Sequence, residues 1–356
     1  MEITLRAIDF FCGGGGMTNG LIQSGIEVIA GVDLDSDAQA TYEANNNGAR
    51  FINEDITKLP LSFFEDEFGV HRNDDEMIFV GCSPCQFYSI IRSSKEKSRK
   101  TKDLLLYFEQ FVDYYRPGYI LVENVPGIMS NKETILNDFL DKIEELGYGN
   151  KNNGKCVYDI VNMKNYGIPQ NRRRFSLIAT RLDKQVHLPE HAEHIMTVQE
   201  AIGNEELYPR IPAGHHDNNL QSYHSTRSLT PINMERIQAV PHNGGTRIAF
   251  RDNPNLQLNC YINRDNSFRD VYGRLFWNKP SSTITTKFLS FTNGRFGHPE
   301  QDRCISVREG ATLKSFPYDY QFLTNSIQTA ARLIGNAVPP EYGRRLGEVL
   351  QAVNNG

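Results

Sequence analysis

Residues 5–33, LRAIDFFCGGGGMTNGLIQSGIEVIAGVD, carry the pattern from which the fold class follows. The segment begins as an apolar strand, enters a glycine-rich turn and continues as a short helix that ends near Gly25. A second apolar strand follows and ends at Asp33. A strand, a helix and a strand in this order are typical of a parallel α/β sheet, so we expect a doubly wound α/β domain.

The alternation of strands and helices continues beyond this unit and then stops. Further strands are expected at 49–53, 76–81 and 118–125, with helices at 103–117 and 132–147. After about residue 183 the sequence becomes rich in Asn, Pro, Gly, His and Arg, with short β-like pieces. We therefore predict a sheet domain over 1–183, a smaller loop- and β-rich domain over 184–318, and a hinge and C-terminal helix over 319–356 that return to the first domain.

Composition excludes several classes of protein. The 356 residues are 39% hydrophobic and 23% charged, which is typical of a chain with a sizeable core rather than a disordered one. The sequence has no membrane-length apolar run, no secretory signal pattern and too few cysteines for a disulfide scaffold. We expect a cytoplasmic protein with reduced thiols and no membrane partner.

The net charge of −5 argues, taken alone, against a general polyanion binder. The charge is unevenly distributed, however. Residues 92–102 hold six Lys or Arg against one Glu, and residues 210–308 hold 13 against seven Asp or Glu. The sequence therefore predicts an acidic body with basic segments that could contact a polyanion.

The glycine-rich turn, DFFCGGGGMTNG (9–20), indicates a ligand held at a helix N-terminus. The spacing differs from a dinucleotide fingerprint, because Thr18 stands where the third glycine would be, and no Lys follows Gly20 as in a phosphate loop. Asp33 ends the second strand, where an acid typically accepts hydrogen bonds from a ribose. A cofactor that contains a nucleoside fits both features.

FVGCSPCQFYS (79–89) follows a predicted buried strand and contains Cys82 and Cys85. A structural metal site would need two more ligands at suitable spacing, and the scattered histidines lack that spacing, so we predict no metal. A redox pair would leave the rest of the chain unexplained. The third interpretation is a single nucleophile, Cys85, whose thiolate is favoured by the basic residues that follow it.

Two further stretches carry candidate site residues. LVENVPG (121–127) places Glu123 and Asn124 at the end of a strongly apolar strand, where α/β sheets bind ligands and where Glu123 would suit proton donation to a ring nitrogen. YGIPQNRRRFSLIATR (166–181) holds Arg172 and Arg174, which share a side if the segment is extended. Paired arginines suit a phosphate or a base edge.

In this order the stretches resemble the motifs of the DNA cytosine-5 methyltransferase family. FCGGGGMTNG is similar to its cofactor-binding motif, SPCQFYS to its PCQ motif, ENV to its glutamate motif and QNRRRF to its QxRxR motif. Downstream, IGNAVPP resembles its GNxV motif, and the resemblance spans residues 7–340. It implies a Rossmann-like methyltransferase domain with a target recognition domain.

The resemblance also implies residue roles. Cys85 would be the nucleophile and Glu123 its acid partner, while Arg172 and Arg174 would orient the cytosine and the catalytic loop. S-adenosyl-L-methionine would be the methyl donor. Asp33 would bind the ribose, Asp55 and Ile56 would contact the adenine edge, and Asn336 and Val338 would lie at the methionine end. The full set of residues that would line the site is Phe11, Gly13, Gly15, Gly16, Asp33, Leu34, Asp55, Ile56, Asn336 and Val338.

The activity implied is methyl transfer to carbon 5 of a flipped-out cytosine in a specific double-stranded DNA sequence. We expect a bacterial-type, monomeric, nucleoid-associated enzyme that modifies DNA for a restriction or other defence system, beside an independently acting endonuclease. Target readout is expected within 224–247 and 260–274. The alternatives are a tRNA cytosine-5 methyltransferase, a non-catalytic DNA-binding regulator with this fold, and a nicotinamide oxidoreductase.

Overall fold

The computed structural model describes residues 4–84, 103–130, 134–219 and 222–356. The chain divides into two compact units, each built from separated segments. Unit 1 comprises residues 1–162, 173–191 and 337–356, and unit 2 comprises residues 163–172 and 192–336. Among the described residues, no helix combines the length and the hydropathy needed to cross a membrane.

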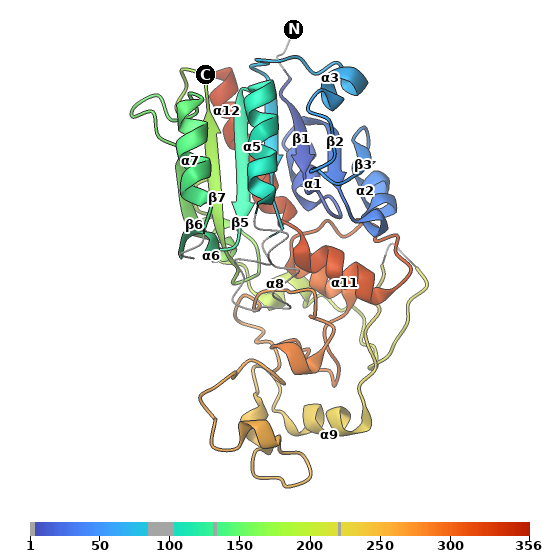
Figure 1. Cartoon of the computed structure of the whole chain (residues 1–356). Helices are drawn as coiled ribbons and strands as arrows, with labels where there is room; N and C mark the ends of the chain where they lie inside the picture. The colour runs from blue at the N-terminus through green and yellow to red at the C-terminus, as the bar shows by residue number, and fades with distance from the viewer. Residues whose placement is uncertain (1–3, 85–102, 131–133, 220–221) are drawn as a thin grey trace. The chain divides into compact units, whose positions relative to one another are not determined.

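Unit 1 contains a mixed seven-stranded sheet in the order β3-β2-β1-β4-β5-β7-β6 (Figure 1). The first five strands in this order pair in parallel, whereas β7 is antiparallel to both of its neighbours. The strands are β1 (Arg6–Phe10), β2 (Glu27–Asp33), β3 (Arg50–Asn53), β4 (Met77–Gly81), β5 (Tyr119–Asn124), β6 (Val157–Asn162) and β7 (Arg173–Thr180). The predicted α/β sheet is therefore confirmed. The sequence analysis did not predict β6, and it considered an extended conformation for the segment of β7 without predicting a strand there.

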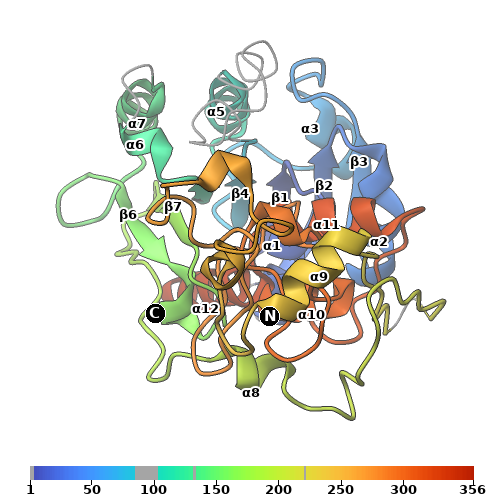
Figure 2. The same cartoon turned by 90° about the horizontal axis from the view of Figure 1, so that it is seen from below.

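Helices cover both faces of the sheet in unit 1 (Figure 2). On one face lie α5 and α7, and on the other lie α1 and α12. Shorter helices occur among the other described residues of the unit. The bounds are α1 (Gly16–Gln23), α2 (Gln39–Asn45), α3 (Phe63–Phe68), α5 (Leu104–Tyr115), α6 (Gly127–Ser130), α7 (Leu136–Glu145) and α12 (Pro340–Asn355).

Aromatic packing holds the ends of β1 and β4, two strands that lead to the candidate site. Phe10, at the end of β1, contacts the rings of Phe64, Phe79, Phe108 and Phe111 at centroid distances of 5.2–5.5 Å. Such aromatic clusters supply much of a core's buried apolar area. The last residue of β4 is a glycine because a Cβ there would lie 2.7 Å from the Phe108 ring.

The C-terminal helix packs against the first helix through glycines. A Cβ at Gly20 of α1 would lie 2.2 Å from the carbonyl oxygen of Pro340, and one at Gly343 would lie 3.0 Å from the carbonyl oxygen of Met17. Farther along α12, a Cβ at Gly347 would lie 2.0 Å from the Ser24 hydroxyl. The last residues of the chain are thereby part of the same layer as the glycine-rich turn.

Unit 2 consists of short helices joined by long loops. Its α-helices are α8 (Val198–Ile202), α9 (Pro231–Ala239), α10 (Val307–Leu313) and α11 (Ile327–Asn336). Short 3-10 turns, η2 (Met163–Tyr166), η3 (Arg247–Phe250), η4 (Asn259–Tyr261) and η5 (Phe291–Asn293), interrupt the loops. The predicted β-like pieces were wrong for the described part of this unit: only isolated bridges occur, such as Arg274 with Gly297.

Buried arginines replace strand pairing as a way to satisfy backbone carbonyls in unit 2. Arg274 is fully buried and donates to the carbonyl oxygens of Val240, Ile237, His298 and Gln301 at 2.7–3.1 Å. A buried carbonyl without a partner would cost about 1–3 kcal/mol, so these bonds hold loops that no strand organises. Part of the positive charge counted in 210–308 therefore lies inside the unit.

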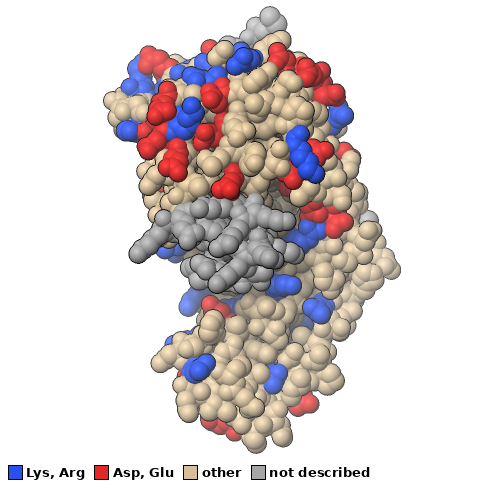
Figure 3. All heavy atoms as spheres, in the orientation of Figure 1, with Lys and Arg blue, Asp and Glu red and all other residues tan. Residues whose placement is uncertain are grey.

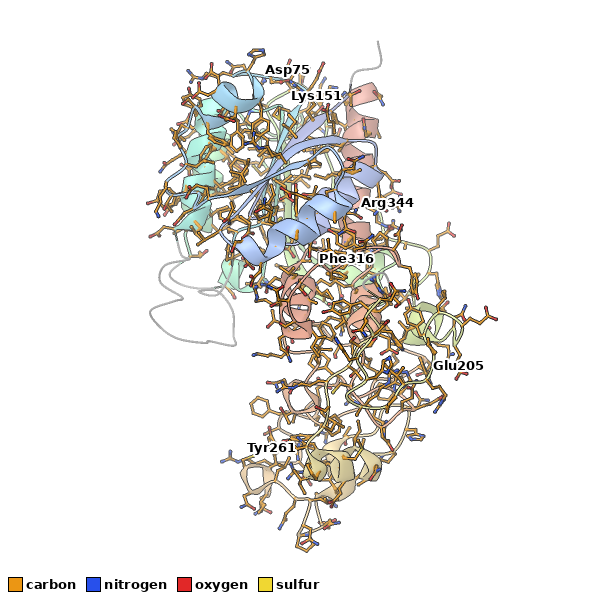
Figure 4. The ribbon with its side chains drawn as sticks, turned by 90° about the vertical axis from the view of Figure 1, so that its right-hand side faces the viewer. Asp75, Lys151, Glu205, Tyr261, Phe316 and Arg344 are labelled. Carbon is orange, nitrogen blue, oxygen red and sulfur yellow. The ribbon has the colours of Figure 1, made fainter. Side chains whose placement is uncertain are left out.

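The surface of unit 2 reflects this burial. On the face shown in Figure 3, Lys and Arg form separate spots on a largely uncharged surface, with few Asp or Glu. Over unit 1, acidic and basic side chains lie mixed. Unit 2 has its own aromatic packing as well, since Phe316, labelled in Figure 4, contacts Tyr320 and Phe322 at 4.7 and 5.3 Å.

Candidate active site

The glycine-rich turn of unit 1 is strained in the way that a close-fitting ligand site requires. Phe11, directly after β1, has φ 65°, and Gly13 and Gly15 have φ 51° and 84°. Gly15 precedes the first turn of α1, whose initial amides lack intrahelical partners. Left-handed backbone at three of five residues brings these amides together at the carboxyl end of β1.

Asp33 is bonded to this turn. Its Oδ2 accepts a hydrogen bond from the amide of Gly13 and its Oδ1 one from the amide of Asp35, both at 2.8 Å. The carboxylate is half-buried at the end of β2. A carboxylate at the end of the second parallel strand is a group that can accept hydrogen bonds from a ligand's hydroxyls.

The other candidate cofactor residues in this part of unit 1 differ in exposure. Leu34 is 69% exposed, which is unusual for a large apolar side chain and provides a free apolar face beside Asp33. Asp55 is half-buried and accepts from the amide and hydroxyl of Thr57 at 3.0 and 2.9 Å. Ile56 is 5% exposed and packs in the core, so only its backbone is available to a ligand.

A buried acid that the sequence analysis did not select lies behind the turn. Asp9 in β1 is fully buried and accepts a hydrogen bond from the Thr18 hydroxyl at 2.7 Å. Thr18 also contacts the hydroxyl of Tyr42 from α2 at 3.1 Å. Burial raises the pKa of Asp9 to about 7; the nearby Asp33 adds to the rise and Thr18 opposes it. The chain of contacts connects β1, α1 and α2 beneath the glycine-rich turn.

Glu123 and Arg174 form an ion pair at the end of β5. The Arg174 Nε lies 3.0 Å from the Glu123 Oε1, and both side chains are largely buried. The pairing follows from the sheet, because β7 runs antiparallel beside β5 with Glu123 opposite Ser176. The contact is an ion pair without a hydrogen bond, since the buried Glu123 Oε1 has no hydrogen-bond partner among the described residues. Two residues that the sequence selected independently are thus in contact.

Asn124, the next residue, connects this strand end to the segment that precedes Cys85. Its side-chain amide donates to the Ser83 hydroxyl at 3.2 Å and to the Ser83 carbonyl at 3.4 Å, and its Oδ1 accepts from the amide of Val125 at 2.9 Å. Asn124 is fully buried and Ser83 is 5% exposed. Cys85 and the basic stretch 92–102 lie outside the described residues, but Ser83 stands two positions before the cysteine.

Arg172 belongs to unit 2 and has different partners from Arg174. It is 3% exposed and donates to the carbonyl oxygens of Ile284 and Gly335 at 3.4 and 3.5 Å. Gln170, which the sequence did not single out, donates to Leu313 at 3.1 Å and accepts from the amide of Ile284 at 3.0 Å. These contacts form an internal brace made of residues from distant parts of the sequence.

The last two candidate cofactor residues fall in different units. Asn336 ends α11 in unit 2 and is exposed, whereas Val338 in unit 1 is 5% exposed. Gly335, before Asn336, approaches the backbone so closely that a Cβ there would lie 2.3 Å from the amide nitrogen of Thr286. Its carbonyl also accepts from the buried Lys314 ammonium at 3.1 Å.

The described residues do not suggest a metal centre. Within them, no three His, Cys, Asp or Glu side chains are grouped so that they could hold a metal ion. The described groups at the end of β5 are a carboxylate, an arginine and Ser83, which precedes Cys85 by two positions in the sequence. Such a combination suits covalent and acid–base catalysis.

Comparison with known proteins places this geometry in context. A family model described as "C-5 cytosine-specific DNA methylase" matches residues 5–352. The Type II methylase M.HgiDII of Herpetosiphon aurantiacus is 37% identical over 358 residues, covering 98% of this chain and 96% of that protein. The Type II methyltransferase M1.BsuMI of Bacillus subtilis is 27% identical, covering 95% of this chain and 79% of that protein.

Solved structures share the fold. A DNA modification methyltransferase encoded within an E. coli prophage superimposes with a TM-score of 0.76 at 22% identity, covering 99% of this chain and all of that one. The Dnmt2 methyltransferase of S. pombe gives a TM-score of 0.61 at 16% identity, covering 99% and 98%. At these identities the likeness concerns the fold alone.

Proposed function

Because the chain belongs to the C-5 cytosine-specific DNA methylase family and is a DNA cytosine-5-methyltransferase, we propose the route and the residues by which it acts. The methyl group comes from S-adenosyl-L-methionine and goes to a cytosine that has been flipped out of a specific duplex sequence. Cys85 forms a covalent bond with the ring during the reaction, and Glu123 is its acid partner.

The arrangement at the end of β5 is the observation that supports this proposal. Arg174 holds the Glu123 carboxylate at 3.0 Å, and Asn124 binds Ser83, two residues before Cys85. One strand end therefore carries the proposed acid and binds Ser83, which precedes the proposed nucleophile by two positions. Covalent catalysis requires such fixed neighbours, because a displacement of about 1 Å can lower a rate about a hundred-fold.

The chemistry explains why both groups are needed. Carbon 5 of cytosine is a weak nucleophile toward a methylsulfonium. Attack by the Cys85 thiolate on carbon 6 breaks the ring's aromaticity and places electron density on carbon 5. Proton donation from Glu123 to ring nitrogen 3 neutralises the charge that develops there. After methyl transfer, removal of the carbon 5 proton by a base lets the Cys85 thiolate leave, and water can serve as that base.

The cofactor fits the residues of the glycine-rich turn in unit 1. Amides at the start of α1, the Asp33 carboxylate and the exposed Leu34 offer donors, an acceptor for ribose hydroxyls and an apolar face for the adenine. Asp55, Ile56 and Val338 in unit 1 and Asn336 in unit 2 complete the proposed set. When bound, the cofactor supplies an electrophilic methyl group.

The substrate and the biological role extend the proposal. We assign unit 2 to target recognition, which adapts the predicted 184–318 domain, and the basic stretch 92–102 to contact with the DNA backbone. Relatives named as Type II methylases support a modification role in a restriction or other defence system. We further propose a monomeric enzyme in the cytoplasm and an endonuclease that acts independently.

Sequencing of bisulfite-treated plasmid DNA from cells that express the chain tests the function directly. We expect protected cytosines at one recurring sequence. Cys85→Ala should abolish protection, whereas Cys156→Ser should preserve it, because Cys156 is a buried thiol near Tyr148 whose contact a hydroxyl can replace. Protection that survives in Cys85→Ala would contradict the covalent route.

Two assays on the purified protein separate the alternatives. A duplex with 5-fluorocytosine at the target should trap a covalent complex, because carbon 5 then has no proton to lose. Methyl transfer to tRNA should be absent beside transfer to duplex DNA. Transfer to tRNA alone would contradict the proposed DNA substrate, and no trapped complex would contradict the role of Cys85.

A further inference from the structure

Unit 2 contains a short loop in which apolar, amide and guanidinium side chains are exposed together. We call residues 262–269 the reading loop. Phe268 is 73% exposed, more than any other large apolar side chain that the structure describes, and Ile262 is 50% exposed. Asn263, Arg264, Asn266 and Arg269 are exposed in the same loop. Apolar, amide and guanidinium groups therefore face solvent together.

The backbone of the loop is held in a conformation that L residues rarely adopt. Asn263 has φ 58°, Phe268 φ 49°, and Tyr272, just beyond the loop, φ 56°. Left-handed backbone at a bulky aromatic residue costs stability and persists only where neighbouring structure enforces it. Such strain clusters where proteins contact ligands. The left-handed backbone at Phe268 lowers the stability of the fold, and the side chain of Phe268 remains exposed to solvent.

A buried arginine enforces the conformation from inside. Arg247 of η3 is 3% exposed, and its guanidinium donates to the carbonyl oxygens of Arg264 and Ser267 at 2.8 and 2.6 Å. The same group lies 4.2 Å from the ring centroid of Tyr261, labelled in Figure 4. Arg247 falls in the stretch 224–247 where readout was expected, but it supports the loop and is unavailable to DNA.

The charges around the loop leave one arginine available. Asp265 in the loop is paired with Arg251 at 2.8 Å, and Asp270 just beyond it is paired with Arg295 at 2.9 Å. The side chain of Arg264 is exposed and has no hydrogen-bond or ion-pair partner among the described residues. Neutralised acids and an available guanidinium favour approach of a polyanion over approach of a basic or neutral partner.

We propose that the reading loop contacts base edges of the target duplex and that Phe268 is a specificity-determining residue. This inference rests on the proposed function. Arg and Asn are the usual partners of guanine and adenine edges, and an exposed Phe suits contact with a thymine methyl group. The hydrogen bonds from Arg247 hold the loop in one conformation before DNA binds. The loop therefore loses little conformational entropy when the contact forms.

A substitution can separate recognition from folding at this position. Phe268→Gly removes the side chain and introduces the residue that accepts φ 49° without strain. The melting temperature should stay the same or rise. Two variants serve as matched controls: Asn73→Gly replaces an exposed left-handed residue of unit 1 at φ 60°, and Ile195→Ala removes a 44% exposed apolar side chain from unit 2.

The experiment compares bisulfite profiles of plasmid DNA methylated by each chain, followed by equilibrium binding to the preferred duplex and to duplexes that differ by one base pair. Phe268→Gly should still methylate DNA but should lose about ten-fold of discrimination at one base pair. Both controls should keep the profile and the discrimination of the unaltered chain.

Three results would overturn the assignment of Phe268. An unchanged profile would show that it reads no base. An equal loss of affinity for every duplex would mark a general contact instead of a base contact. A melting temperature that falls below that of Asn73→Gly would mark a structural role. In contrast, an unaltered chain that methylates no DNA would contradict the proposed function itself.

Discussion

Asn124 illustrates how one buried amide can serve catalysis without touching a substrate. It lies beside Glu123 at the end of β5, and its donors are both directed to Ser83. A buried amide whose donors lose their acceptors costs about 1–3 kcal/mol, so the contact holds the Ser83 segment firmly. We regard Asn124 as a positioning residue for the segment that leads to Cys85.

Removal of this amide should slow methyl transfer with little change in cofactor affinity. Asn124→Ala should lower kcat by about ten- to a hundred-fold, because the nucleophile's segment loses its anchor. Ser83→Ala removes one of the two acceptors and should have a smaller effect. Single-turnover kinetics and calorimetric titration with S-adenosylhomocysteine measure the two properties. Equal losses in cofactor affinity and rate would indicate a general structural role.

The pKa of Asp9 predicts a specific pH dependence of stability. Because the folded state keeps the Asp9 proton up to a pH of about 7, its contribution to stability is lost as the pH rises through that value. Asp9→Asn keeps an acceptor for Thr18 and removes the titration. Relative to the unaltered chain, it should gain on the order of 2 kcal/mol between pH 5 and pH 8.

Urea denaturation at pH 5 and pH 8 measures this difference. Thr18→Val serves as a matched variant, since it removes the hydrogen bond to Asp9 but leaves the carboxyl group to titrate. Parallel stability curves for Asp9→Asn and the unaltered chain would show that Asp9 does not titrate in this range.

At the scale of residues, the sequence predicted which side chains have suitable chemistry but did not predict which side chains they contact. Glu123 and Arg174 were selected from separate motifs, and their contact depends on the antiparallel pairing of β5 and β7, which no local pattern encodes. Asp9 was missed because a polar residue in an apolar stretch gives no indication of which group satisfies it. The role of Gln170 was missed because its partners, Leu313 and Ile284, lie far away in the sequence. Cys85 lies outside the described residues and stays a prediction.

At the scale of elements, glycines set how closely α1 and α12 approach. Gly20→Ala would place a methyl group 2.2 Å from the Pro340 carbonyl, whereas Gly343→Ala would meet its nearest atoms at 3.0 Å. Alanine gains up to about 1 kcal/mol of helix propensity at either position, so the difference between the variants reports the clash. We expect Gly20→Ala to lose about 2–3 kcal/mol and Gly343→Ala much less.

Chemical denaturation of both variants tests the packing. The two substitutions are chemically identical and lie on the two facing helices, so each controls for the other. Similar losses of stability would mean that the α1–α12 contact relaxes readily and that the glycines are not required for it.

The N-terminus of α10 makes unit 2 sensitive to acid. Glu309 is fully buried, caps the helix through Ser306 and binds Arg303 through two hydrogen bonds at 2.7 and 2.8 Å. His298 lies beside it, and its Nδ1 accepts from the amides of Glu300 and Gln301 at 3.1 Å. Burial lowers the pKa of His298 to about 3, a shift that Glu309 opposes and that Arg303, Arg274 and Arg210 reinforce.

Unit 2 should therefore lose stability as the pH falls below about 6.5. In that range His298 gains a proton only when the chain unfolds, so the unfolded state is favoured by about 2 kcal/mol at pH 5. His298→Gln should reduce this loss, whereas Glu300→Gln, at an exposed carboxylate nearby, should not. Thermal unfolding at pH 7 and pH 5 measures the effect, and equal slopes for all three chains would contradict it.

Sequence patterns predicted the elements of unit 1 far better than those of unit 2. The strand at 27–33 was predicted to the residue, because alternating glycine-rich turns and apolar runs mark a buried parallel strand. The edge strand β6, VYDIVN, escaped notice because Tyr158 and Asp159 are exposed and break the apolar run. In unit 2, β-like pieces proved to be loops held by buried arginines such as Arg274.

At the scale of the whole molecule, the connectivity determines which parts can fold alone. Residues 1–191 contain the whole sheet of unit 1 and lack α12. This fragment would expose the glycine face of α1, so it should be only marginally folded. Adding residues 337–356 through a flexible linker should restore a cooperative thermal transition. Equal melting behaviour of the two polypeptides by circular dichroism would show that α12 is dispensable for the fold.

The segment 163–172 has a consequence for exchanging specificity between relatives. It leaves the sheet after β6, enters unit 2 and returns as β7, and its Gln170 and Arg172 bind Ile284, Leu313 and Gly335 there. A graft of all of unit 2 would have to be cut at four junctions, whereas a graft of residues 192–336 alone would need two cuts and would separate Gln170 and Arg172 from their partners. A smaller cassette that includes residues 262–269 and spares the brace can be transplanted as one piece.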